Sequence, residues 1–478
     1  MKTEIYKLSA TELSKAYENK ALSPVEVTNS IIDRIKDVDD KINAYVFIDE
    51  ESAMKQAKDS ESRWKNGSQK SPIDGVPTAI KDLLYTKGWP TLRGSKTIDP
   101  NKEWNDDAPV TARLKEAGSI LIGKTTTPEF GHRGTTQSPL TGITRNPWNL
   151  EKTSGGSSGG SSSSVASGMG PLAIGTDGGG SVRIPCAYTG LFGIKPTFGK
   201  IPAWPLSPFG TIANVGPMTR TVRDGAMLYA QISQPDWRDW HADSSMSSNF
   251  IGRLSEGIKG KKIAYSKDFG MSPFWNFELM DKDVILNVEN TVKLLEDLGA
   301  YVEEIDINWA SNPKEAFNIL WTSGAAFLSK DFTEEENNLL DPVFKKFCDI
   351  GKEHPLFTRI AAENSRGENA AVINEIFQNF DLIVGPTMPT VAFKAENIVP
   401  DGWDQDEFDY TPFTYPFNMT CHPAATINCG FSEGLPIGFQ IIAKKDYDVD
   451  TFVCAAALEE AEPSPDCTGI FFLIVKQY

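Results

Sequence analysis

The chain has 478 residues, of which 40% are hydrophobic and 23% charged, an ordinary globular composition that excludes intrinsic disorder and collagen-like structure. Asp and Glu outnumber Lys and Arg by 64 to 47, and the net charge of −17 argues against binding to nucleic-acid backbones or anionic membranes. The first 30 residues lack the apolar core of a signal peptide, and the late apolar run Ile470 to Val475 is too short to span a bilayer. The six cysteines contain no Cys-x-x-Cys pair. We therefore expect a cytoplasmic protein with free thiols and no zinc site.

Hydrophobic periodicity and turn residues predict alternating helices and strands. The predicted elements are helical structure over residues 8–65, a buried strand ending at 81–82, a helix over 111–118, a strand over 119–122, a helix over 283–299, and strands over 300–307 and 381–384. Thr11 or Ser23 is expected to cap a helix start, and Gly299 to end the helix before it. This order predicts an α/β protein with a largely parallel sheet.

The stretch Ser154–Ser181 departs from the composition of its surroundings, with ten Gly and nine Ser in 28 residues. A flexible linker has such a composition. However, the stretch contains the apolar insert Pro171–Ile174 and lacks a polar boundary, and a solvated linker needs no such insert. We therefore expect ordered structure here.

Two short motif matches carry little weight. Gly118–Thr125 fits the phosphate-binding pattern G-x-x-x-x-G-K-[ST], but its loop residues are Ser-Ile-Leu-Ile, which favour a strand. Gly155–Gly159 fits the G-x-S-x-G pattern of α/β-hydrolases, but no apolar strand precedes it. Nothing except its residue type nominates His422 as a partner base. Neither a nucleotide site nor an α/β-hydrolase site is predicted.

Three separated pieces form a stronger pattern. They are Gly75–Asp82, which presents Lys81 after an apolar run, Gly155–Gly160, which presents Ser157 in a tight backbone, and Gly175–Pro185, which presents Ser181 after three glycines. Consecutive glycines let main-chain N–H groups converge on one point. Such a nest beside a serine is what an oxyanion hole requires.

These pieces resemble the amidase signature family, whose members cleave C–N bonds with a Ser–Ser–Lys triad. The resemblance covers about residues 72–220 and resumes more weakly after residue 416. Its further motifs are Asn146-Pro-Trp148, Gly193–Thr197, Gly216–Arg220, Pro416-Phe-Asn418, His422-Pro-Ala and Gly434–Gln440. The resemblance implies that Ser181 is the nucleophile, Ser157 the bridging serine on a cis peptide bond, and Lys81 the base.

The same resemblance implies where the substrate is held. The amides of Gly178, Gly179, Gly180 and Ser181 are expected to hold the oxyanion, and Gly131 to contact the substrate through its backbone. No metal or cofactor is expected.

The implied mechanism requires a neutral Lys81. A serine hydroxyl needs a base to take its proton, and lysine acts as a base only when desolvation lowers its pKa from the usual value of about 10.4. Asp82 follows directly, but strand alternation points it to the opposite face. Lys81 is therefore expected to have no obligatory salt bridge.

We expect one domain over residues 1–478, with a mixed β-sheet flanked by α-helices on both faces. Its expected parts are a helical start over 1–70, the signature core over 72–220, a variable region over 240–380, and a C-terminal part over 381–478 that closes the core. Residues 463–478 depart from the family's usual helical ending. If this apolar tail is exposed, it predicts self-association.

Among family branches, the chain looks most like stand-alone bacterial amidases and aryl acylamidases. The glutaminase subunits of tRNA-dependent amidotransferases usually carry Gln where this chain has Ile184, and Tyr-Gly-Arg where it has Phe198-Gly-Lys200. The expected substrate is a small amide, an anilide or a carbamate, as in a urethanase. The expected assembly is a monomer or homodimer, without nucleic acid or membrane. A glutaminase subunit of a complex and a non-catalytic binder on the same fold remain alternatives.

Other residues have structural or functional interpretations. Arg183 fits a structural ion pair better than a substrate contact, Asp177 is expected to order the glycine loop, and Cys186 is expected in the core. His132 and the segment Trp204–Phe209 each fit a pocket wall and plain packing equally well. Substrate choice is expected to lie in residues 125–140, 200–212 and 310–350, with Trp321 and Phe327 as candidates.

Overall fold

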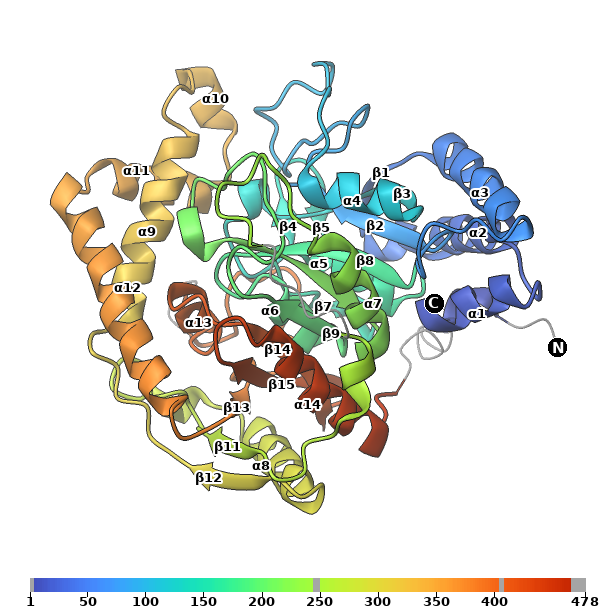
Figure 1. Cartoon of the computed structure of the whole chain (residues 1–478). Helices are drawn as coiled ribbons and strands as arrows, with labels where there is room; N and C mark the ends of the chain where they lie inside the picture. The colour runs from blue at the N-terminus through green and yellow to red at the C-terminus, as the bar shows by residue number, and fades with distance from the viewer. Residues whose placement is uncertain (1–3, 244–249, 404–407, 466–478) are drawn as a thin grey trace.

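A sheet of eleven strands crosses the molecule (Figure 1). The structure is a computed structural model that describes residues 4–243, 250–403 and 408–465. In sheet order the strands are β1 (Tyr45–Ile48), β3 (Ile120–Thr125), β2 (Pro77–Lys81), β8 (Leu172–Asp177), β10 (Asn214–Thr219), β9 (Phe192–Lys195), β14 (Ala424–Ser432), β15 (Leu435–Ala443), β13 (Leu382–Pro386), β11 (Lys262–Tyr265) and β12 (Tyr301–Glu304). Two small ribbons pair β4 (Gln137–Ser138) with β5 (Gly142–Ile143) and β6 (Arg145–Asn146) with β7 (Asn149–Thr153).

The sheet is mixed, as expected for the domain as a whole, whereas the largely parallel sheet expected from the alternation of helices and strands is wrong. β2 pairs in parallel with β3 and β8, and β11 with β13 and β12. The other six pairings are antiparallel. One of them, between β14 and β15, is a hairpin closed by Glu433 and Gly434, both at positive φ. A two-residue turn of this kind joins antiparallel strands without a crossover helix.

Helices cover both faces of the sheet, as expected. They are α1 (Ala10–Glu18), α2 (Pro24–Ile42), α3 (Glu50–Lys65), α4 (Pro109–Ala117), α5 (Gly159–Ala166), α6 (Arg183–Thr189), α7 (Val222–Ile232), α8 (Lys282–Asp297), α9 (Pro313–Leu328), α10 (Glu334–Leu339), α11 (Pro342–Lys352), α12 (Leu356–Ile376), α13 (Tyr415–Met419) and α14 (Asp448–Ala461). α5 and α6 pack on one face of the central strands, and α7 and α14 on the other. α9, α11 and α12 form a separate helical group at one side (Figure 1).

Local sequence signals place most of the predicted elements. Gly118 (φ +81°) follows α4, and Gly299 (φ +91°) follows α8, as the glycine stop signals indicate. Residues 8–65, expected to be helical, form α1, α2 and α3, but they also contain β1, which was not predicted. Of the two proposed caps, Ser23 caps α2 through a capping box, whereas α1 is capped by Ser9 instead of Thr11.

The glycine- and serine-rich stretch is ordered and buried. It forms the loop before α5, α5 itself, and then β8. All eight residues of α5 are buried, so small side chains are required for this helix to lie under the sheet. The linker interpretation is therefore excluded.

The chain ends are only partly described. Of the atypical ending 463–478, residues 466–478 lie outside the described residues, and the run Ile470–Val475 and Cys467 lie there too. Cys186, Cys348, Cys421, Cys429 and Cys454 are free. No helix within the described ranges is long and apolar enough to cross a membrane.

Candidate active site

Lys81 lies at the C-terminal end of β2 with its side chain in the protein interior. Every residue of β2 is buried, since the strand lies between β3 and β8. The Lys81 Nζ donates to Ser157 Oγ at 2.7 Å, Ser158 Oγ at 2.8 Å and Thr176 Oγ1 at 2.9 Å. No carboxylate lies within ion-pair distance of Lys81 in the part of the chain that the structure describes. Its polar environment thus consists of hydroxyl groups.

The pKa of Lys81 is lowered well below that of a free lysine. Burial is the main cause, because desolvation disfavours the charged ammonium, and the negative charge of Asp177 opposes this effect only in part. Lys81 therefore meets the electrostatic requirement for a neutral amine.

Ser157 and Ser158 lie in the tight loop before α5. The peptide bond between Gly156 and Ser157 is cis, as expected from the resemblance. A Cβ on Gly156 would lie 2.7 Å from the backbone of Thr135, so the loop can take only glycine there. The Ser158 hydroxyl donates to the Thr176 carbonyl at 3.1 Å and accepts the Thr176 N–H at 3.2 Å. This ties the serine loop to β8.

Ser181 follows the three glycines and precedes α6. The Ser158 N–H donates to the Ser181 carbonyl at 3.2 Å, which brings the two serine loops together. Ser181 is 6% exposed and lines the same pocket as Ser157. Within the described residues its Oγ has no hydrogen-bond partner, so Ser157 and Ser181 are not hydrogen-bonded to each other. The hydroxyl of Ser181 is free to meet a ligand.

Asp177 and Arg183 hold the glycine loop in place. Asp177 accepts the N–H of Gly180 at 2.7 Å and that of Val182 at 3.2 Å. The Arg183 guanidinium meets the Asp177 carboxylate with two bonds of 3.0 Å, and both side chains are buried. Burial alone would raise the pKa of Asp177, but the charge and hydrogen bonds of Arg183, with a bond from Asn418, bring it to about 2. Both structural interpretations are confirmed.

The glycines proposed for substrate contact are not equivalent. Gly178 and Gly131 line the pocket, whereas Gly179 and Gly180 are not among its lining residues. The Gly180 N–H already donates to Asp177, which differs from the prediction that this N–H holds the oxyanion. The Gly131 N–H donates to the Pro128 carbonyl at 2.8 Å, which leaves its carbonyl for a substrate contact.

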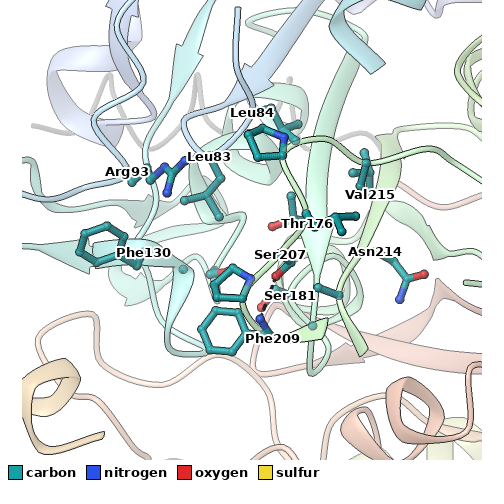
Figure 2. A pocket seen from close by; sticks show the side chains of 18 of the residues that line it. Leu83, Leu84, Arg93, Phe130, Thr176, Ser181, Ser207, Phe209, Asn214 and Val215 are labelled. Carbon is teal, nitrogen blue, oxygen red and sulfur yellow. Dashed lines mark hydrogen bonds between the residues drawn. The ribbon is translucent and has the colours of Figure 1, made fainter. Parts of the chain in front are cut away.

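The pocket of about 150 Å³ that contains both serines is mostly apolar (Figure 2). The three stretches expected to choose the substrate all contribute, with residues 130–131, residues 202–209, and Trp321 together with Leu328. Phe209 and Trp321 stack with ring centroids 4.2 Å apart. The segment Trp204–Phe209 is therefore a pocket wall, and the alternative of plain surface packing does not apply. Phe327 is 59% exposed and does not line the pocket.

Other residues singled out in the sequence lie away from this pocket. His132 packs against Phe344 and Phe347 and does not line it, and burial lowers the pKa of His132 to about 3. Cys186 lies in the core. Lys124, which belongs to the segment that matches the phosphate-binding pattern, lies on β3 and pairs with Asp82. In the described ranges, no group of three potential metal ligands occurs.

Three residues of the site are not among those predicted from the sequence. Ser158 and Thr176 bind Lys81, and Arg93 lines the pocket. The parallel pairing of β2 with β8 places Thr176 beside Lys81, and no local pattern reveals that pairing. Ser158 is visible in the sequence as the neighbour of Ser157, but its partner is not.

Comparison with known proteins finds matches over almost the whole chain. A family model described as Amidase matches residues 26–452. An acylamidase of Rhodococcus erythropolis is 33% identical, with 96% of each chain covered. A component of the glutamyl-tRNA(Gln) amidotransferase of Bacillus velezensis is 32% identical, covering 94% of this chain and 96% of that protein. The crystal structure of a bacterial aryl acylamidase of the amidase signature enzymes superposes with a TM-score of 0.90 at 29% identity, covering 97% of this chain and 98% of that one.

Proposed function

Because the chain belongs to the amidase signature family and is an amidohydrolase of C–N bonds, we propose that it works through an acyl-enzyme on Ser181, with Ser157 and Lys81 moving the protons. The observation that carries this proposal is the environment of Lys81, a buried amine surrounded by hydroxyl groups and 2.7 Å from Ser157 Oγ.

The hydrogen bonds of Lys81 support the direction of proton transfer. A neutral amine has two N–H donors and one lone pair. The hydroxyl proton of Ser158 is directed to the Thr176 carbonyl, so Ser158 can only accept from Lys81. The three bonds that Lys81 donates belong to its ammonium form. In the neutral form Ser158 Oγ and Thr176 Oγ1 accept its two N–H groups, and its lone pair accepts the hydroxyl proton of Ser157.

The first half-reaction forms the acyl-enzyme. Ser181 Oγ attacks the amide carbonyl carbon while its proton passes to Ser157 Oγ, and the proton of Ser157 passes to Lys81 Nζ. N–H groups at the glycine loop, with Gly178 in the pocket wall, stabilise the oxyanion. When the C–N bond breaks, Ser157 protonates the leaving nitrogen and regains a proton from Lys81. The products are a free amine and an ester on Ser181.

The second half-reaction uses water in place of the amine. Water attacks the ester carbonyl while Ser157 and Lys81 accept its proton by the same route. Collapse of the oxyanion intermediate returns the proton to Ser181 and releases the carboxylic acid. All side chains in the sequence of steps come from one chain, so the proposal requires no second protein.

The pocket supports an aryl or alkyl amide, an anilide or a carbamate as substrate. Its walls are mostly apolar and aromatic, and no acidic residue lines it. Free glutamine would need a negative group for its α-ammonium, so the pocket argues against glutaminase activity of this chain alone. The similarity to the amidotransferase component nevertheless makes glutamine a necessary comparison substrate.

The test is release of 4-nitroaniline from a small acyl anilide by the purified wild type and single-site variants. Ser181→Ala and Lys81→Ala are expected to abolish turnover, and His132→Ala to retain it, because His132 lies outside the pocket. Glutamine and a carbamate are assayed in parallel. An active Lys81→Ala variant together with an inactive His132→Ala variant would overturn the proposed mechanism.

A further inference from the structure

Arg93 is the single charged residue in the lining of the active-site pocket, all of which the structure describes. Figure 2 shows it on the Leu83 and Phe130 side of the pocket. A permanently charged guanidinium against apolar walls gains stability from an anion placed opposite it.

The charged groups near Arg93 do not neutralise its positive charge. The nearby buried carboxylate, Asp82, already has Lys124 Nζ 3.8 Å from its Oδ1. Its Oδ2 accepts the main-chain N–H groups of Leu92 at 3.1 Å and of Arg93 at 2.9 Å. The Asp82–Lys124 pair is neutral overall, so the group of three charges carries one positive charge.

The Arg93 guanidinium uses few of its N–H donors within the described residues. It donates to the Tyr85 hydroxyl at 3.2 Å, and its central carbon lies 5.5 Å from the Tyr85 ring centroid. Within the described residues no carboxylate lies at ion-pair distance from it. Because arginine has five N–H donors, most remain for a ligand.

The backbone fixes the position of Arg93. Its φ of +56° lies in the left-handed region, which residues other than glycine rarely adopt. Its N–H is held by Asp82, and its carbonyl accepts the Phe130 N–H at 2.8 Å. A Cβ on Gly94 would lie 2.5 Å from the Thr127 carbonyl, so this loop packs directly on the next one. Such unusual backbone conformations cluster at functional sites.

We propose that Arg93 binds a carboxylate of the substrate, and that the preferred substrates are amides with an apolar or aromatic body and one carboxylate. A guanidinium binds a carboxylate with two parallel charge-assisted hydrogen bonds. The pocket lining has no acidic group for an ammonium, so amides of free α-amino acids are excluded from this class. The inference rests on the proposed function, since the pocket is taken as the substrate site.

Two matched substrate pairs test the proposal and locate the carboxylate. 4-Acetamidobenzoate against 4-methylacetanilide places it on the amine part, and succinanilate against butyranilide places it on the acyl part. For wild type, kcat/KM is expected to favour the charged member of one pair by about 10- to 100-fold. Arg93→Met should bring that ratio close to one. Arg93→Glu should reverse the charge preference, so that a 4-(aminomethyl)anilide is hydrolysed faster than the carboxylate substrate.

Arg238 provides the matched control. Its guanidinium carbon lies 5.2 Å from the ring centroid of Trp204, a pocket residue, but Arg238 itself does not line the pocket and pairs with Asp236. Arg238→Met should keep both the basal activity and the charged-to-neutral ratio. If Arg238→Met lowers the ratio as much as Arg93→Met, or if Arg93→Met slows both members of each pair equally, the proposal is overturned.

A binding measurement separates this proposal from the catalytic one. In the Ser181→Ala background, 4-acetamidobenzoate or succinanilate should raise Tm more than its neutral counterpart, and Arg93→Met should remove the difference. Loss of that difference is expected even if Ser181 is not the nucleophile. Equal stabilisation with and without Arg93 would refute the carboxylate site, whereas turnover by Ser181→Ala would refute only the mechanism.

Discussion

The ends of β2 and β3 each carry a buried lysine, and the two differ in their partners. Lys81 and Lys124 are both 0% exposed and lie at or next to the ends of neighbouring parallel strands. Lys81 is surrounded by three hydroxyl groups. Lys124 donates to the Leu84 carbonyl and to Thr91, and it pairs with Asp82.

Because both lysines are buried, the difference between them lies in the charged partner that Lys124 has and Lys81 lacks. Burial lowers the pKa of both lysines, that of Lys124 to about 8, where the charge of Asp82 resists a further fall. Asp82 follows Lys81 in sequence but turns to Lys124, as strand alternation predicts. Asp82 thus pairs with the β3 lysine and leaves the β2 lysine without a carboxylate partner, as the proposed proton transfer requires.

The largest expected effect is the loss of catalysis in Lys81→Met. Removal of a general base costs about 10²- to 10⁴-fold in kcat, and Ser157 then has no acceptor for its proton. The fold should tolerate the change because no buried charge is left unpaired. Steady-state kinetics and thermal unfolding of the same preparation measure both quantities. An active Lys81→Met enzyme would remove the contrast between the two lysines.

Lys124→Met should instead reduce stability. It leaves the buried carboxylate of Asp82 without its partner, which costs about 3–5 kcal/mol in the free energy of unfolding. The double variant Asp82→Asn with Lys124→Met should recover most of that loss, because it removes both charges. Denaturant unfolding measures the stability, and kcat is measured on the folded fraction. If Lys124→Met is folded but as inactive as Lys81→Met, the assignment of roles is wrong.

The pH profile tests which group carries the proton. The neutral amine is the active form, so kcat/KM should fall as the pH falls through the pKa of Lys81. Burial lowers that pKa, so the midpoint should lie well below the value of about 10.4 for a free lysine. The His132→Ala variant should show the same fall of kcat/KM, which we call the rising limb of the pH profile. A histidine with a pKa of about 3 stays neutral throughout this pH range. Disappearance of the limb in His132→Ala would show that Lys81 is the wrong base.

Ser158→Ala should have the smallest effect. It removes one hydroxyl acceptor of Lys81, and we expect kcat to fall about tenfold with KM little changed. Since that hydroxyl stabilises the ammonium form, the rising limb of the pH profile should also move to lower pH. A loss of stability with an unmoved profile would instead assign Ser158 a purely structural role.

The sequence predicts the parts of the fold that depend on local signals. The turn residues before β2 and the glycines after α4 and α8 act within a few residues, and those elements lie where expected. The sheet is less parallel than predicted because its antiparallel pairings depend on the spatial order of β8, β10 and β9, which no local pattern encodes. β1 has only four residues and lies between two polar helices, so its pattern is hidden.

The residues of the candidate site also fall into those that local sequence reveals and those that it does not. Lys81, Ser157 and Ser181 are recognisable because each lies within a dense local motif. Thr176 and Arg93 acquire their positions only from strand pairing and from contact between two loops. Gly180 resembles its neighbours in sequence, and only the structure shows that Asp177 takes its N–H.

The most direct test of the account is a mass measurement on enzyme that has been acid-quenched during turnover of a slowly hydrolysed acyl anilide. We expect a mass increase equal to one acyl group, located by peptide mapping on Ser181. Lys81→Met should form this adduct far more slowly, and folded Lys124→Met should retain it. No adduct under conditions of active turnover, or an acyl group on another residue, would contradict it.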